Sequence, residues 1–161
     1  DQRIWLMNQS QTKFQPLIPE NWYRHGTENC HDFFSKDGNI GWVDYKEGAF
    51  EYIIETGEIN HVWKTPLCHA QASRHRDYWV ADQSPYFWPN GKCDVKFYDR
   101  KKGIETDIFS ALKCPMSCDR HLYHCDPHPC FSNDDKYITS TTSVFDRFDV
   151  AITPVENIIS K

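Results

Sequence analysis

Residues 49–64 read AFEYIIETGEINHVWK, and their pattern decides the fold class. Phe50, Tyr52 and Ile54 occupy every second position, so they share one face of an extended chain. The turn at residues 55–58 contains a glycine, and the alternation resumes after it. This stretch therefore predicts a β-hairpin over residues 49–64.

Similar short patterns extend outward from this hairpin. A second hairpin is predicted over residues 93–109, with its turn at 99–103, and further strands are predicted at 77–81, 137–142 and 148–153. Helical periodicity is weak, with short candidates only at 108–113 and 154–161. The sequence predicts a mainly β fold, an antiparallel β-sandwich or barrel-like domain of about seven to eight short strands with long loops and little helix.

The chain shows no fixed repeat and no linker, so we expect one domain over residues 1–161. Residues 1–20 are polar and end in proline-rich sequence, which is typical of an extended N-terminal arm with one edge strand. Residues 21–39 mix aromatic, glycine and polar residues and indicate a loop.

Cysteine is abundant for a chain of 161 residues. The seven cysteines are Cys30, Cys68, Cys93, Cys114, Cys118, Cys125 and Cys130. This content is typical of disulfide-stabilised secreted proteins, so we expect about three disulfides and a secreted or extracellular ectodomain location. The odd cysteine allows a covalent dimer.

Two further features bear on processing. The chain begins with Asp1 and has no basic start followed by an apolar stretch, so we expect any signal peptide to have been removed. The sequon Asn8-Gln9-Ser10 predicts glycosylation at Asn8.

Residues 114–130 form a Cys/His-rich loop with the spacing Cys-x3-Cys-x6-Cys-x4-Cys. Disulfides explain this loop most simply, and we expect no cofactor and no metal. The alternative is a zinc-stabilised interaction domain, because cysteine and histidine are the usual zinc ligands. Its ligands would be Cys114, Cys118, His124 and Cys125.

Aromatic side chains are concentrated in loops. Tyr86, Phe87 and Trp88 lie between prolines, and Trp22 and Tyr23 form a second pair. Rigid aromatic residues on loops are common anchors of protein interfaces, although these rings could also cover the core. We therefore expect an extracellular binding module that recognises a protein receptor or partner subunit, as in a glycoprotein ectodomain fragment or a secreted effector.

The sequence favours this binding role over an enzyme, because no nucleophile or phosphate-binding motif is present. The alternative is a secreted ribonuclease-like hydrolase that uses His/Glu acid–base chemistry. Its candidate residues are Glu58, His61, His69, Arg74, His75 and Arg76.

The charge balance limits the partners. The formal net charge of −5 argues against nucleic acid, and no apolar run is long enough to span a membrane. The chain has eight histidines, and protonating all of them would change the charge from −5 to +3. The sequence therefore allows a pH-sensitive interface, with an ordinary polar surface as the alternative.

Overall fold

A computed structural model describes residues 4–17, 29–83, 92–113 and 126–160. These residues form thirteen short strands in four antiparallel sheets and one short helix. The prediction of a mainly β fold with little helix is confirmed. The prediction of a sandwich or barrel is wrong, because the strands are divided among four sheets that follow one another along the chain.

The N-terminal hairpin consists of β1 (Trp5–Met7) and β2 (Phe14–Pro16). The first sheet has the order β3 (Asn29–Phe34), β4 (Ile40–Asp44), β5 (Gly48–Ile53) and β6 (Glu58–Trp63). The second sheet contains β7 (Ala70–Ala72), β8 (Tyr78–Asp82), β9 (Lys92–Asp99) and β10 (Ile104–Lys113), again as sequential neighbours. The third sheet consists of β11 (Cys130–Phe131), β12 (Tyr137–Thr142) and β13 (Asp149–Pro154).

Both predicted hairpins are present. In the first, β5 pairs with β6 and places Phe50 opposite His61. In the second, β9 pairs with β10 across the turn that ends at Gly103. Alternation was a sufficient signal in both cases, because successive side chains of a strand point to opposite faces.

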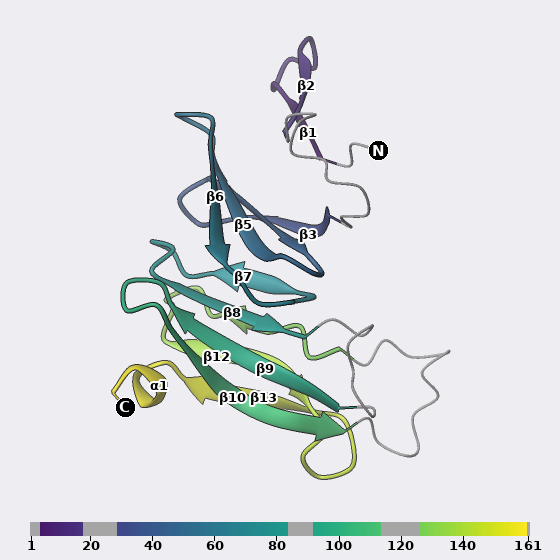
Figure 1. The fold of residues 1–161 in the computed structure, drawn as a ribbon, viewed down its shortest axis with the longest axis vertical. Coiled ribbons are helices and arrows are strands. Elements are labelled where there is room, and N and C mark those ends of the chain that lie inside the picture. The colour runs from purple at the N-terminus through teal and green to yellow at the C-terminus, as the bar shows by residue number, and fades with distance from the viewer. Residues whose placement is uncertain (1–3, 18–28, 84–91, 114–125, 161) are drawn as a thin grey trace.

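The sheets stack face to face, and each interface has its own apolar core (Figure 1). Ile4 and Leu17 of the N-terminal segment pack on Trp42 of the first sheet. Val43, the next residue of β4, packs with Trp79 of the second sheet. The third interface joins the second and third sheets through Val80, Phe97, Phe131, Ile138 and Val155. Successive up-and-down sheets stacked in this way have the architecture of β-propeller blades.

A tight turn recurs after the first strand of each of the three sheets. A serine opens the turn, and the residue three positions later has a positive φ and donates its backbone N–H to the serine carbonyl oxygen. The serine and positive-φ residues are Ser35 with Gly38, Ser73 with Arg76, and Ser132 with Asp135. The chain therefore contains an internal structural repeat, although the serines are unequally spaced.

Disulfides are absent among the side chains that the structure describes. Cys93 and Cys130 are free thiols, and Cys93 is fully buried in β9. This differs from the predicted disulfide-stabilised fold, and the physical reason is that a buried cysteine also serves as a small apolar core residue. Residues 114, 118 and 125 and the side chain of Cys30 lie outside the described part.

Helix is limited, in the described ranges, to the single turn α1 (Glu156–Ile159), which lies near the C-terminus (Figure 1). It falls within the helical candidate at residues 154–161. None of the helical structure described here has the length or apolar character needed to cross a bilayer.

The first and second sheets are also joined by a buried ionic cluster. Glu51 of β5 is only 2% exposed, and its carboxylate accepts hydrogen bonds from Arg100 at 2.7 Å and Arg76 at 3.1 Å. Both arginines belong to turns of the second sheet. Because a buried charge is costly without a partner, this cluster fixes how the two sheets pack.

We expect Leu67→Ala to lower the free energy of unfolding by about 2–5 kcal/mol, because the fully buried Leu67 would leave a cavity between the first and second sheets. The matched variant Ile152→Ala lies on β13, where the side chain is 65% exposed, and should change that free energy by no more than about 0.5 kcal/mol. Chemical denaturation followed by tryptophan fluorescence measures both. Equal losses would contradict this assignment of the core.

Glu51→Gln should lower the free energy of unfolding by about 3 kcal/mol, because it removes the charge that faces two arginines in a buried site. Lys101→Gln is the control, since Lys101 is 74% exposed in its ion pair with Asp77 and should cost no more than about 1 kcal/mol. The same denaturation measurement applies. A cost for Glu51→Gln as small as that of the control would show that the cluster does not stabilise the interface.

Candidate functional site

Three histidines converge where the first strands of the three sheets begin. His31 lies on β3, His69 immediately precedes β7, and His128 lies two residues before β11. The ring centroid of His69 is 4.2 Å from that of His31 and 3.5 Å from that of His128. Each histidine stands four residues before the serine of the repeated turn, so the repeat itself brings the three rings together.

Asp82, at the end of β8, orients two of these histidines. Its carboxylate is fully buried and lies 3.0 Å from Nδ1 of His69. It also accepts the backbone N–H of His69 at 2.8 Å and that of His128 at 2.9 Å. Since Nδ1 of His69 donates to this carboxylate, Nε2 of the same ring is left as a Lewis base.

His69, Asp126 and His128 form a group of metal-ligand type. One ligand atom from each residue lies within 4.8 Å of those of the other two. Asp126 is 6% exposed and His69 is 6% exposed, whereas His128 is open to solvent. His128 has a φ of 45°, in the left-handed region that is rare for residues other than glycine and is common at functional sites.

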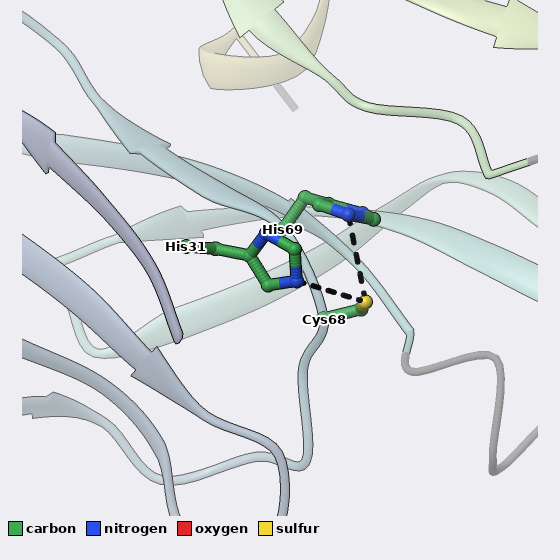
Figure 2. Close-up of side chains that lie close together, drawn as sticks. All are labelled: His31, Cys68 and His69. Carbon is green, nitrogen blue, oxygen red and sulfur yellow. Dashed lines mark hydrogen bonds between the residues drawn. The ribbon is translucent and has the colours of Figure 1, made fainter. Parts of the chain in front are cut away.

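Cys68 and His31 also lie close to His69. The Cys68 Sγ is 3.7 Å from Nε2 of His69 and 3.9 Å from Nε2 of His31, and Figure 2 shows both rings directed toward the sulfur. These three residues form a second group whose ligand atoms lie within 4.8 Å of one another. Nε2 of His31 also lies 3.0 Å from the Tyr45 hydroxyl, so this ring is oriented from the first sheet.

A cavity of about 330 Å³ opens at these residues. Its walls come from the first strand of each sheet and from the residues just before β7 and β11. They include His31, His69 and His128 together with Asp32, Gln71 and Cys130. A small polar ligand can therefore reach the histidine cluster.

Two further cysteines near this centre differ from Cys68. Burial raises the pKa of the Cys93 thiol to about 12, and the charges of Asp82 and Asp126 act in the same direction. This favours the protonated thiol, and Cys93 belongs to neither group of ligand atoms found in the described residues. Cys130 lines the cavity, but its Sγ lies 3.0 Å from the Thr139 hydroxyl within the third sheet.

Among the six residues proposed for a hydrolase, the structure places only His69 at this cavity. Glu58 and His61 lie on β6, where His61 stacks on Phe50 and its Nε2 lies 2.8 Å from the Glu47 carbonyl oxygen. Arg74, His75 and Arg76 lie in the turn after β7, and Arg76 binds Glu51 and Asp37.

Several predicted site residues lie outside the described part of the chain. These are the aromatic residues Trp22, Tyr23, Tyr86, Phe87 and Trp88, and the alternative zinc ligands Cys114, Cys118, His124 and Cys125. Asn8 is described and exposed. Its Nδ2 already donates to Ser10 at 2.8 Å and to Thr12 at 3.0 Å within the β1–β2 turn.

Sequence reasoning missed His31, Asp82, Asp126 and His128 as parts of one site. A usable signal was present, because the pattern His-x3-Ser occurs three times, at residues 31–35, 69–73 and 128–132. A repeated pattern of this kind indicates repeated structural units, which place equivalent residues side by side.

Known proteins share this fold. No family model matches the chain, and the search of curated proteins found no match. An oligogalacturonate lyase in complex with manganese superposes with a TM-score of 0.76 at 22% identity, over 100% of this chain and 43% of that chain. The oligogalacturonate lyase of Vibrio parahaemolyticus gives 0.69 at 19% identity, over 95% of this chain and 42% of that one. TolB from Acinetobacter baumannii superposes with a TM-score of 0.65 at 11% identity, over 95% of this chain and 35% of that chain. The chain thus spans less than half the length of these proteins and is similar to them in fold.

Proposed function

We propose that this chain contributes a manganese site to a lyase that acts on an acidic oligosaccharide. The observation that carries the proposal is the group His69, Asp126 and His128, with ligand atoms within 4.8 Å of one another beside an open cavity. The likeness to an oligogalacturonate lyase in complex with manganese supports both the metal and the substrate class. Because the chain spans 43% of that protein, the activity is proposed for the protein of which these sheets form part.

The residues fit a divalent transition-metal ion. Two imidazoles and a carboxylate suit Mn²⁺ and its neighbours in the first transition row. The Asp82 carboxylate accepts Nδ1–H of the His69 ring, which is the outer contact that metal-bound histidines commonly have, and it also accepts the backbone N–H of His128. When bound, the ion would supply a positive charge that attracts a substrate carboxylate and stabilises negative charge developing on it.

His31 is placed to move a proton. A lyase that cleaves a uronate chain removes the proton beside the carboxylate, and the electron pair of that C–H bond forms a double bond as the glycosidic oxygen leaves. His31 lines the cavity and is an imidazole outside the group His69, Asp126 and His128. Its Nε2 lies 3.0 Å from the Tyr45 hydroxyl, and it can accept this proton at the cavity wall once that contact opens.

Recognition of a macromolecule through aromatic loops stays a prediction, as does a secreted or ectodomain location. The partner subunit or receptor expected from the sequence likewise stays a prediction.

His128→Ala should abolish Mn²⁺ binding by the chain, because it removes one of three ligands. Calorimetric titration with Mn²⁺ measures binding, and the rise of unsaturated product from oligogalacturonate measures lyase activity in the full-length protein. His75→Ala, in the turn after β7 and exposed, is the control and should leave both unchanged. Unaltered Mn²⁺ affinity in His128→Ala would overturn the proposed site.

Asp82→Asn keeps the shape of the side chain but removes the charge that faces Nδ1 of His69. Mn²⁺ affinity should fall by about 10–100-fold, as for other changes to residues that orient metal-bound histidines. The comparison is Asp134→Asn, an exposed residue of the β11–β12 turn. Equal affinities for the two variants would contradict the positioning role of Asp82.

A further inference from the structure

The cluster offers a second ligand set that the manganese proposal leaves unused. We propose that Cys68, His31 and His69 bind Zn²⁺ at the same centre, with the Cys68 thiolate as the distinguishing ligand. This zinc site rests on the proposed function in one respect, because it treats Zn²⁺ and Mn²⁺ as competitors for one site. The proposal assigns Cys68 to metal binding and names zinc as an alternative occupant.

Two of the three distances between the ligand atoms are close to those of a zinc site. Zinc binds thiolate sulfur at about 2.3 Å and imidazole nitrogen at about 2.0–2.1 Å with tetrahedral angles, so the sulfur and nitrogen of one site lie about 3.6 Å apart. The observed separations are 3.7 Å from the Cys68 Sγ to Nε2 of His69 and 3.9 Å to Nε2 of His31. Each exceeds the tetrahedral edge by only a few tenths of an ångström.

The two ligand sets share the residue His69, and only one nitrogen of its ring is open to an ion. Nδ1 of His69 faces Asp82, so Nε2 is the nitrogen that this ring offers to an ion. Nε2 cannot bind one ion with Asp126 and His128 and a second ion with Cys68 and His31. Zinc and manganese must compete at His69.

The chemistry of Cys68 decides which ion the second set prefers. Thiolate is a soft ligand that selects zinc over manganese, and zinc also stands above manganese in general affinity for nitrogen and sulfur ligands. Cys68 is 1% exposed, so a thiolate there is stabilised far more by a bound cation than by water. Zinc binding would also take up Nε2 of His31, which the proposed function uses as proton acceptor, so zinc would inhibit the lyase.

The test uses the full chain freed of metal with a chelator, and Co²⁺ as the spectroscopic substitute for Zn²⁺. Wild-type protein with one equivalent of Co²⁺ should show a near-ultraviolet thiolate-to-cobalt charge-transfer band that Zn²⁺ removes by competition. Cys68→Ser should lose the band, and its Zn²⁺ affinity should fall by about tenfold or more, while its Mn²⁺ affinity stays unchanged. Cys130→Ser is the matched control, because Cys130 lines the same cavity and should keep the band.

Persistence of the band in Cys68→Ser would overturn the proposal, since another cysteine would then hold the ion. Absence of the band in the wild type would also overturn it. The proposed function fails separately, if Mn²⁺ does not bind the wild type or binds His128→Ala equally well.

Two measurements keep the test decisive if Cys68→Ser does not fold. X-ray absorption of wild-type protein with one equivalent of zinc should show sulfur at about 2.3 Å, and a shell of only nitrogen and oxygen would refute the proposal. His31→Ala changes a partly exposed residue and should weaken Zn²⁺ binding but not Mn²⁺ binding. Equal effects on the two ions, or none, would contradict the ligand set.

Discussion

The buried carboxylate of Asp82 is the group on which the site depends. It receives the backbone N–H groups of His69 and His128 and the ring of His69, and these residues belong to different parts of the chain. A buried carboxylate is costly unless its oxygens are hydrogen-bonded. The position of Asp82 therefore requires the segment before β11 to lie against the second sheet, so the same contacts stabilise the fold and bring His69 and His128 together.

The stacked sheets explain how a site can form from residues so far apart in sequence. Each of the three larger sheets begins with a short strand that leads into a serine-opened turn. β7 contacts β11 of the third sheet and β4 of the first, and residues of β3, β7 and β11 line one cavity. Asp135 in the turn of the third sheet binds Lys36 of the first sheet at 2.7 Å and the backbone N–H of Arg74 of the second at 2.7 Å. These contacts hold together the ends of β3, β7 and β11 that lead into the turns. The histidines lie at the opposite ends of these strands.

Local alternation predicted the hairpin strands even where both faces are buried, as in β5, and it failed where polar and apolar residues do not alternate. The two hairpins have polar residues at alternate positions, and their registers follow the prediction. By contrast, every residue of β4 is buried, because Trp42 and Val43 pack on opposite neighbours, so the pattern there is a continuous apolar run. In β3 a bulge between Cys30 and Phe33, with a φ of 52° at His31, interrupts the alternation.

The site was missed because its histidines are close only through the repeat. We expected disulfides because the number of cysteines is typical of proteins in an oxidising compartment. Cys93 is instead a core residue and a free thiol.

The two proposed metal sites meet at His69. A ring whose Nδ1 is held by a carboxylate offers a single lone pair, so in the proposed sites the neighbouring ligands would determine which ion receives it. One group around His69 contains Asp126 and His128, and the other contains Cys68 and His31. Hard oxygen ligands and a soft sulfur ligand prefer different metals. If both proposed sites exist, Cys68, which immediately precedes His69 in the sequence, would therefore contribute to metal choice together with the ligands from distant strands.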